Sequence, residues 1–292
     1  MQEFDENSIT DAVVERVARA EDDRVRVIST ALVRHLHAFV KEIEPSEAEW
    51  EAGIRFLTET GKMCSATRQE FILLSDTLGV SMLVDAINHR FPGEATQTTV
   101  FGPFYVEPPL FANGGHIEGH LTGRPMYVAG SVADVGGQPI AGAVVDVWHS
   151  DDQGFYDLQK LADEPDYSGR GRFKTDADGR FHLWTIRPVA YPIPDDGPVG
   201  KMLAAQGRHP FRPEHIHFMI TDPGHQKLVT HIFADGDTYL DSDVVFGVKA
   251  SLIRTFERHL GGTAPDGQAM AGEWFSLVHD FRLAAVDHAE EK

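Results

Sequence analysis

Two histidines separated by a single residue are the first feature of this sequence that could carry chemistry. His215 and His217 flank Ile216 in a stretch that is expected to form a strand. Positions i and i+2 of a strand share a face, so both imidazoles can reach one point, as a metal site requires. The alternative is two surface histidines on a strand. Pro213 and Ile216 favour a half-buried strand edge, and therefore the metal site.

A metal ion held by two imidazoles needs further, anionic ligands. The single cysteine, Cys64, cannot form a thiolate cluster, and Glu214 should point away from the histidine face. Tyr156 follows a predicted strand and Tyr191 opens a proline-rich segment. A phenol has a pKa of about 10, so it becomes a good ligand at neutral pH only beside a strong Lewis acid such as ferric iron. For any single tyrosine, a packed ring with a hydrogen-bonded hydroxyl is the alternative.

The residues alone leave two other classes of protein open. One is a hydrolase that uses Zn²⁺ with the same two histidines, which would need a carboxylate or a third histidine and no phenolate. The other is a non-catalytic β-sandwich protein for binding or scaffolding, of the transthyretin type, which residues 130–148 also resemble. Colour distinguishes the three classes, because a ferric tyrosinate is wine-red whereas a zinc or metal-free protein is colourless.

The spacing of these residues and their flanking motifs resemble the intradiol ring-cleavage dioxygenases. Tyr191 follows Tyr156 by 35 residues (191 − 156) and precedes His215 by 24 (215 − 191). The similarity extends over nearly the whole chain, and an Arg-Pro-x-His-Ile-His motif with two placed tyrosines is specific. The matching motifs are Val-Trp-His at 147–149, Gly-Phe-Tyr at 154–156, Gly-Arg-His at 207–209, Arg-Pro-Glu-His-Ile-His at 212–217 and Lys-Leu-Val-Thr at 227–230.

This resemblance implies a β-sandwich catalytic domain over residues 106–292 behind an N-terminal helical domain, residues 1–105, that joins two subunits into a homodimer. It also implies one ferric ion, Fe(III), per subunit and an aromatic diol and O2 as substrates, with cleavage between the two hydroxylated carbons. The implied metal ligands are Tyr156, Tyr191, His215 and His217. Relatives carry a lipid in the helical domain, so a lipid partner is left open.

Within the family, the chain is most similar to the members that cleave hydroxyquinol, benzene-1,2,4-triol. Val-Phe-Gly-Pro-Phe at residues 100–104 and the pair Ile193 and Pro194 resemble that branch. Typical catechol-cleaving members instead carry Glu before the Gly-Pro and Gly-Cys-Pro after the tyrosine. The implied product is 3-hydroxy-cis,cis-muconate, the enol form of maleylacetate, in aromatic compound catabolism. Cleavage of catechol or chlorocatechol is the alternative.

The resemblance also implies roles for residues around the metal. Tyr191 is displaced by the substrate and takes one of its protons, and the fixed charge of Arg212 stabilises negative charge on the ring. His231 stands where catechol-specific members carry Gln, and it can still donate a hydrogen bond. Asp76 shares a helix face with Leu73 and is expected to accept a hydrogen bond from the third hydroxyl. The implied substrate-binding residues are Leu73, Asp76, Val100, Phe101, Gly102, Pro103, Phe104, Ile193, Pro194 and Arg212.

The composition is that of a globular, strongly acidic protein. Hydrophobic residues make up 42% of the 292 positions, which is enough for a core. The net charge of -19 disfavours nucleic acid and anionic membranes as partners. The N-terminus lacks the features of a secretory signal, and no apolar run approaches the ~20 residues that span a bilayer. These observations predict a cytoplasmic protein.

Helices are predicted over the first third of the chain. One apolar stripe, with spacings of three and four, is made up of Val25, Ile28, Leu32, Leu36, Phe39 and Ile43. It is longer than one small helical layer requires, which favours a homodimer interface; the alternative is packing within its own subunit. Ser46 and Glu49 form a capping box for a second helix that Gly61 should end, and a third helix is predicted over residues 71–87.

After about residue 105 the pattern changes to short strands separated by Gly, Pro and Asp turns, which indicates a β-sandwich. The expected strands cover residues 126–132, 143–148, 171–175, 179–186, 215–221 and 227–233. The third and fourth of these, and the last two, are expected to pair as hairpins. Residues 189–213 are rich in Pro and Gly and predict a long ordered loop, a feature that is usually functional inside a compact domain.

Overall fold

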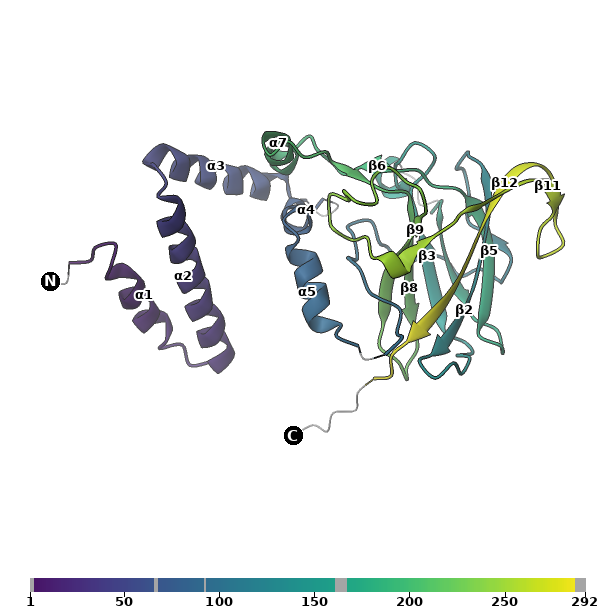
Figure 1. The fold of residues 1–292 in the computed structure, drawn as a ribbon, viewed down its shortest axis with the longest axis horizontal. Coiled ribbons are helices and arrows are strands. Elements are labelled where there is room, and N and C mark those ends of the chain that lie inside the picture. Colours follow the sequence, from purple (N-terminus) through teal and green to yellow (C-terminus); the bar gives the residue numbers. More distant parts are fainter. Residues whose placement is uncertain (1–2, 66–67, 92, 161–166, 287–292) are drawn as a thin grey trace. The chain divides into compact units, whose positions relative to one another are not determined.

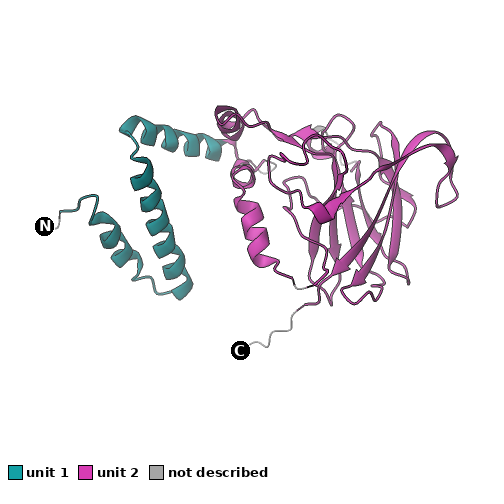
Figure 2. Ribbon diagram, viewed as in Figure 1, with its two compact units in different colours: residues 1–62 teal, residues 63–292 magenta. Residues whose placement is uncertain are grey.

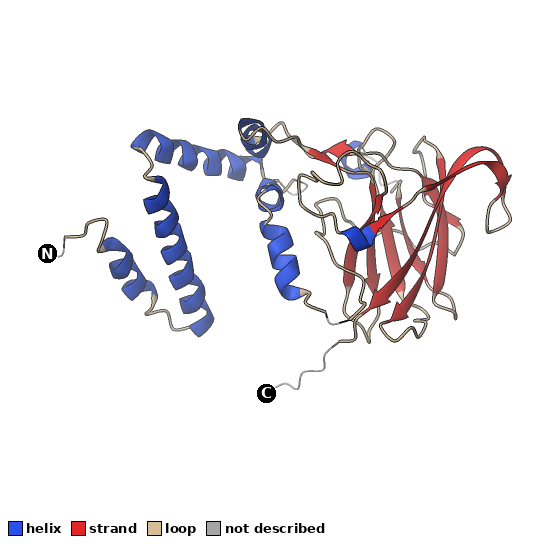
Figure 3. Ribbon diagram, viewed as in Figure 1, coloured by secondary structure: helices blue, strands red, loops and turns tan. Residues whose placement is uncertain are grey.

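The structure, a computed structural model, describes residues 3–65, 68–91, 93–160 and 167–286. The chain divides into two compact units, Met1–Lys62 and Met63–Lys292 (Figure 2). Among the described residues, every strand lies in the second unit (Figure 3). The predicted boundary near residue 105 falls inside that unit, and the division into a helical and a sandwich domain at this point stays a prediction.

The first unit is built from the helices α1 (Ile9–Val17), α2 (Asp23–Ile43) and α3 (Glu47–Met63) (Figure 1). The carboxylate of Asp22 caps α2 by accepting from the Val25 backbone N–H at 2.8 Å. The predicted capping box is present, since the Ser46 backbone N–H donates to the Glu49 carboxylate at 2.8 Å. The prediction that Gly61 ends this helix is wrong: α3 runs on to Met63, because a glycine inside a helix costs only about 1 kcal/mol.

The predicted apolar stripe lies on α2 and faces outward. Its six residues are each 51–62% exposed in the single chain. Helix α1 reaches α2 elsewhere, where the Thr10 hydroxyl lies 3.1 Å from Nδ1 of His37. An apolar row of this length in water is unusual for a monomer. Within the first unit, the stripe is therefore not covered by α1 or α3.

Two short helices, α4 (Glu70–Thr77) and α5 (Val80–Asn88), replace the single helix predicted over residues 71–87. Gly79 separates them with a φ of 72°, a left-handed conformation that glycine adopts without strain. Helix α4 buries Leu73 and Asp76 together, as their spacing predicts.

None of the helices in the described part of the chain combines the length and apolar character of a membrane crossing. A cytoplasmic location stays a prediction.

Two five-stranded sheets dominate the second unit (Figures 1 and 3). One sheet has the order β1 (Gly115–His116), β5 (Arg180–Ile186), β2 (Pro125–Asp134), β12 (Ala269–Leu283) and β11 (Glu257–Thr263). The other has the order β10 (Ile253–Arg254), β9 (Leu228–Ala234), β8 (His215–Thr221), β3 (Val144–Trp148) and β4 (Arg170–Lys174). A separate pair joins β6 (Tyr191–Pro192) to β7 (Phe211–Arg212). The predicted class, mainly β with a helical N-terminal part, is confirmed.

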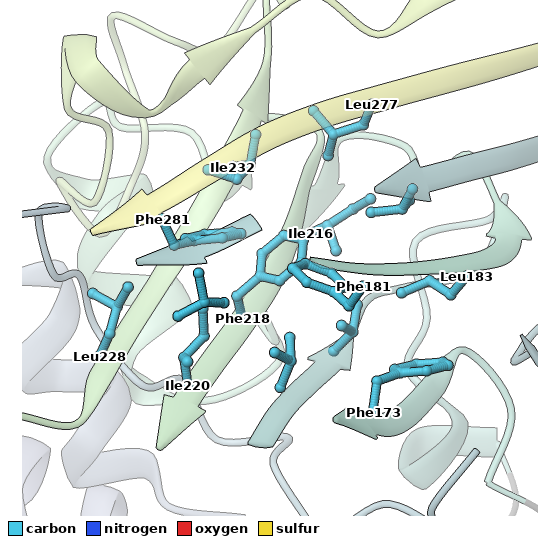
Figure 4. Packing of buried hydrophobic residues seen from close by; sticks show 14 of the residues in the cluster. Phe173, Phe181, Leu183, Ile216, Phe218, Ile220, Leu228, Ile232, Leu277 and Phe281 are labelled. Carbon is cyan, nitrogen blue, oxygen red and sulfur yellow. The ribbon is translucent and has the colours of Figure 1, made fainter. Parts of the chain in front are cut away.

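The core of the second unit lies where the two sheets face each other (Figure 4). Ile216, Phe218 and Ile220 of β8 point into it and are at most 1% exposed, and each such side chain stabilises the fold by about 1.5–3 kcal/mol. Because side chains alternate along a strand, His215 and His217 point to the opposite face of the same sheet. The packing of the core therefore fixes the direction of both imidazoles.

One predicted hairpin is confirmed and the other is wrong. Strands β8 and β9 pair in antiparallel fashion, as expected. The turn at residues 176–179 forms, but β4 pairs with β3 whereas β5 pairs with β1 and β2, so the chain crosses between sheets there. Phe173 and Phe181 both enter the common core from their separate sheets. Turn chemistry is local, and it does not determine which sheet each flanking strand joins.

The segment 189–213 is more regular than the predicted loop. Besides β6 and β7 it holds α7 (Pro198–Ala205), which starts with proline at its first position, where a missing N–H costs nothing. The remaining short helices are α6 (Asp157–Lys160) and the 3-10 turn η1 (Ala250–Leu252). The strands β11 and β12 were not predicted, although β12 is the longest strand that the structure describes.

Candidate active site

Four donor atoms from three segments of the second unit converge on one point. Oη of Tyr156 lies 2.8 Å from Nε2 of His217 and 3.3 Å from Oη of Tyr191. Nε2 of His217 lies 3.2 Å from Nε2 of His215. All four side chains are at most 5% exposed. The structure therefore brings together the four residues that the sequence predicts as metal ligands.

The strand β8 and its neighbour β3 orient the two histidines. Trp148 is the cross-strand partner of His217, and its ring stacks on the imidazole with centroids 4.6 Å apart and planes 19° apart. The Pro213 carbonyl lies 2.6 Å from Nδ1 of His215. A carbonyl can only accept, so Nδ1 carries the proton and Nε2 of His215 presents its lone pair to the site.

Backbone conformation allows the two tyrosines to meet. Gly154 has a φ of 86°, and a Cβ at this position would lie 2.5 Å from the Cβ of Tyr191. Only glycine permits this approach of the segment that leads into Tyr156. The ring of Tyr156 stacks on Phe104, with centroids 4.5 Å and planes 22° apart. On the other side, Tyr191 is the register partner of Arg212 in the β6–β7 pair.

A buried ion pair fixes the segment that carries Tyr156. Nε of Arg170 donates to Oδ2 of Asp157 at 2.7 Å, and Nη1 of Arg170 donates to the Phe104 carbonyl at 3.0 Å. Arg170 is 1% exposed and Asp157 is 5% exposed. Arg170 thus links Asp157, which follows Tyr156 in the chain, to Phe104, whose ring stacks on Tyr156. Sequence analysis missed both partners, because no local motif marks an ion pair formed by tertiary structure.

The donor set fits a single metal ion. Ligand bonds of about 2.0–2.1 Å at angles of about 90–109° place neighbouring donors about 2.8–3.4 Å apart, and the three contacts that link the donors here are 2.8–3.3 Å long. Nδ1 of His217 is buried without a partner among the described residues. The polar contacts of this ring are therefore made by Nε2, the nitrogen that faces the other donors. Two phenols and two imidazoles, without carboxylate or thiolate, suit a strong Lewis acid such as ferric iron.

Burial shifts the pKa values of all four donors toward the neutral forms. It raises the pKa of Tyr156 well above 10 and also raises that of Tyr191, where the Arg212 charge acts in the opposite direction. It lowers the pKa values of His215 and His217 well below 6.5. Neutral imidazoles are ready to bind a metal. The phenols ionise only where a cation offsets their burial.

A third histidine borders the donors. His231 of β9 is the register partner of His217, and their ring centroids lie 4.0 Å apart. The Thr99 hydroxyl bonds Nδ1 of His231, while its buried Nε2 has no partner in the described part of the chain. One nitrogen each of His215, His217 and His231 lies within 4.8 Å of the others. The geometry alone therefore supplies the third histidine that the zinc alternative requires.

Arg212 places a permanent positive charge beside the donors. It is 3% exposed, and its Nη1 lies 3.2 Å from Nε2 of His215. Burial opposes the charge of Arg212, but its ion-pair partner Asp243 raises the pKa above the ordinary 12.5. Asp243 was not among the predicted site residues.

The predicted substrate-binding residues line two adjoining cavities beside the donors. The residues of the narrow one include Leu73, Asp76, Val100, Gly102, Pro103, Phe104, Ile193, Pro194 and Arg212. Phe101 lines a wider cavity of about 600 Å³, which shares Asp76, Val100 and Gly102 with the narrow one. Val245 also lines the narrow cavity and was missed, because it lies in a segment without a motif.

Asp76 is the acidic side chain among the residues that line the narrow cavity. It is 4% exposed. Burial raises its pKa, whereas a hydrogen bond from Ser81 and the charge of Arg212 favour the carboxylate. Leu73 and Val100 make the surrounding wall apolar. A buried carboxylate in such a wall can accept a hydrogen bond from a hydroxyl group of a ligand.

Known proteins match both parts of this chain. A family model described as "Catechol dioxygenase N terminus" matches residues 22–96, and one described as "Dioxygenase" matches residues 102–284. A 6-chlorohydroxyquinol 1,2-dioxygenase from Cupriavidus pinatubonensis is 53% identical over 90% of this chain and 95% of its own. A hydroxyquinol 1,2-dioxygenase from a Rhizobium species is 48% identical over 96% of both chains.

Solved structures agree with these relatives. The crystal structure of hydroxyquinol 1,2-dioxygenase from Pseudomonas putida DLL-E4 superposes with a TM-score of 0.89 at 50% identity, over 96% of this chain and 98% of its own. The catechol 1,2-dioxygenase of Pseudomonas arvilla C-1 reaches a TM-score of 0.82 at 28% identity, over 96% and 93%. These relatives are neither zinc hydrolases nor scaffold proteins. The chain belongs to the intradiol ring-cleavage dioxygenases, a family of non-haem iron enzymes.

Proposed function

We propose that this protein is a hydroxyquinol 1,2-dioxygenase. It cleaves the ring of benzene-1,2,4-triol between carbons 1 and 2, and both atoms of O2 enter the product, 3-hydroxy-cis,cis-muconate or its tautomer maleylacetate. The relatives of 43–53% identity that are named for hydroxyquinol or its 6-chloro derivative support this substrate. The observation that carries the proposal is the buried carboxylate of Asp76 on the cavity wall beside the four donors.

One ferric ion per subunit, held by Tyr156, Tyr191, His215 and His217, completes the site. When bound, this ion supplies the Lewis acidity that favours the doubly deprotonated diol and makes its ring reactive toward O2. Two phenolates offset two of its three positive charges, which favours the ferric state. Three contacts of 2.8–3.3 Å link the four donor atoms in a row, and they support this ligand set.

The two tyrosines have different surroundings, and these suit different roles. Tyr156 is restrained by the Phe104 stack and by its short contact with His217. Tyr191 lies on a two-residue strand beside the Arg212 charge. Tyr191 is therefore the phenolate suited to take one proton of the diol when iron is bound; a hydroxide would take the other, and Tyr156 would stay in place. Burial keeps the resulting phenol neutral.

Arg212 and His231 act on the charge that develops during the reaction. Nη1 of the buried Arg212 is close enough to the donors to stabilise negative charge on the ring and on oxygen. Nε2 of His231 is buried and unpartnered in the described residues. This nitrogen can donate a hydrogen bond to the reacting groups, as the side-chain amide of Gln can in catechol-specific relatives.

The cavity walls position the ring. Apolar contacts from residues such as Leu73, Val100 and Ile193 hold its faces, while Asp76 accepts a hydrogen bond from the third hydroxyl. A site built for this hydroxyl disfavours a diol without it, because the carboxylate is then left with fewer partners. The adjoining cavity of about 600 Å³ leaves room for a substituent on the ring.

The same proposal includes a homodimer formed through the stripe on α2. Its six apolar side chains are about half exposed in the single chain, and a second copy of the same stripe can cover them around a two-fold axis. Two-fold dimers with such isologous contacts are the commonest soluble homo-oligomers.

A substrate panel tests the proposed function directly. Purified, iron-loaded protein should be red, and it should consume one O2 for each molecule of hydroxyquinol. The product should have the ultraviolet spectrum of maleylacetate. Catechol and a chlorocatechol should react with much lower kcat/KM, whereas 6-chlorohydroxyquinol should react well. Equal or higher kcat/KM with catechol or chlorocatechol would instead favour the catechol-cleaving branch, to which the structural match with Pseudomonas arvilla also points.

A further inference from the structure

Arg212 is held by a carboxylate that no sequence motif marks. Its Nε donates to Oδ1 of Asp243 at 3.1 Å and its Nη2 donates to Oδ2 at 3.3 Å. The side chains are 3% and 5% exposed, respectively. Two parallel hydrogen bonds fix the plane of a guanidinium as well as its position. The remaining group, Nη1, is the one that lies 3.2 Å from Nε2 of His215.

The carboxylate of Asp243 is itself fixed by the loop that follows it. Oδ2 accepts from the Gly247 backbone N–H at 2.9 Å, and Oδ1 accepts from the Val245 backbone N–H at 3.4 Å. A Cβ at Gly247 would lie 3.0 Å from Nη2 of Arg212 and 3.1 Å from Oδ2 of Asp243. A side chain at position 247 would therefore crowd the ion pair, and the backbone forms a close cradle around it.

This loop is also tied to the helix that carries Asp76. The Arg208 guanidinium donates to the Thr77 carbonyl at 2.7 Å and to the Val244 carbonyl at 3.0 Å. Val245, next in the loop, lines the narrow cavity, whereas Asp243 does not. One connected frame thus holds the cavity wall, the carboxylate and, through the carboxylate, the charge of Arg212.

We propose that Asp243 is a positioning residue for ring cleavage, which acts by fixing the guanidinium of Arg212 beside the metal donors. The inference rests on the proposed function, and in particular on Arg212 as the group that stabilises negative charge on the reacting ring. Asp243 neutralises a cation that burial would otherwise disfavour, and it leaves Nη1 free to face the site. It does not touch the substrate.

The first test compares two Asp-to-Asn changes on the same loop. Asp243→Asn keeps the shape of the side chain but loses its charge and one acceptor oxygen. We expect kcat for hydroxyquinol to fall by about 10- to 100-fold, since small misplacements of a catalytic group have effects of this order. KM, iron content and the red colour should stay close to those of the wild type. Asp241→Asn, at an exposed position two residues earlier, should change none of these quantities.

A double-mutant cycle separates positioning from a general structural role. In an Arg212→Gln background, Asp243→Asn should lower kcat less than about twofold further, because the group it positions is already absent. Losses that multiply would overturn the inference. If Asp243→Asn does not fold, Gly247→Ala tests the inference instead, because its Cβ crowds the guanidinium of Arg212 without removing a charge. This variant should have a lower kcat and the iron content of the wild type.

The failure of this inference differs from the failure of the proposed function. If the wild type does not cleave hydroxyquinol, the proposed function is wrong. If the wild type cleaves it and both Asp243→Asn and Gly247→Ala do so at the wild-type rate, only the role of Asp243 is wrong.

Discussion

Oη of Tyr156 lies 2.8 Å from Nε2 of His217, a residue 61 positions further along the chain. Each partner is fixed independently: His217 by its stack on Trp148, and Tyr156 by Phe104 and the Arg170–Asp157 pair. The core of the sandwich sets the first arrangement and a buried ion pair sets the second. The site is thus preorganised by protein contacts, and a metal ion meets donors that already converge.

Removal of one donor should therefore remove the metal. We expect Tyr156→Phe and His217→Ala to lose both iron and red colour, because each deletes a proposed ligand atom. Tyr127→Phe, which changes another buried tyrosine outside the site, should keep both. Elemental analysis and the visible absorption spectrum measure the outcome. Stoichiometric zinc in active wild-type protein would contradict the ferric site.

Stability at mildly acidic pH should depend on His149. Nε2 of this fully buried ring lies 2.5 Å from the Thr185 hydroxyl, and burial lowers the pKa of His149 from 6.5 to about 4. Between these values the unfolded chain binds a proton that the folded protein does not bind. Folding stability is therefore lost as the pH falls from 6.5 toward 4, by up to about 3 kcal/mol.

The comparison with His149→Gln isolates this effect from that of the carboxylates. The variant cannot titrate at this position, so the difference in unfolding free energy between wild type and variant should shrink as the pH falls from 7 to 4. Urea unfolding of the iron-free proteins, followed by tryptophan fluorescence, measures it. Two curves that stay parallel over this range would show that His149 does not contribute.

The assembly should depend on the apolar stripe of α2. Leu32 is 62% exposed in the single chain, and Leu32→Glu would place a charge in the proposed two-fold interface, where burial without a partner is costly. We expect the wild type to sediment as a dimer and this variant as a monomer of about 32 kDa. Arg34→Glu, on the opposite face of the same helix, should remain dimeric. A monomeric wild type at micromolar concentration would rule out the interface.

Features governed by local periodicity were predictable from the sequence. The rule that positions i and i+2 of a strand share a face placed His215 and His217 correctly, and the spacing of three and four defined the exposed stripe on α2. The resemblance to a known family supplied the tyrosines and the cavity wall. These predictions needed only the direction of a side chain relative to its own strand or helix, or a pattern already seen elsewhere.

Features decided by long-range packing were not predictable in this way. The strands on either side of residues 176–179 join different sheets, because each finds its hydrogen-bond partners in distant segments. Arg170 and Asp243 look like ordinary charged surface residues in the sequence, yet both are buried in ion pairs. Nothing within a few positions of either residue indicates its partner, so the supports of the site emerge only from the tertiary structure.

Asp76 provides the test of substrate preference. Hydroxyquinol differs from catechol by one hydroxyl, and Asp76 is the 4%-exposed carboxylate in the narrow cavity that can accept a hydrogen bond from it. A hydrogen bond to a charged group contributes about 1.5–3 kcal/mol. Asp76→Ala should therefore reduce kcat/KM for hydroxyquinol by about tenfold for every ~1.4 kcal/mol lost, and should reduce kcat/KM for catechol much less.

The variant Asp76→Asn refines this test, because it keeps one acceptor oxygen and should lose less of the preference than alanine does. Iron content should stay constant in both variants, since Asp76 is not one of the four donors. Steady-state kinetics with both substrates measure the ratio of the two kcat/KM values. A loss that is equal for hydroxyquinol and catechol, or absent for both, would make Asp76 a structural residue. The preference would then have to arise from the shape of the wall formed by Val100, Phe101 and Ile193.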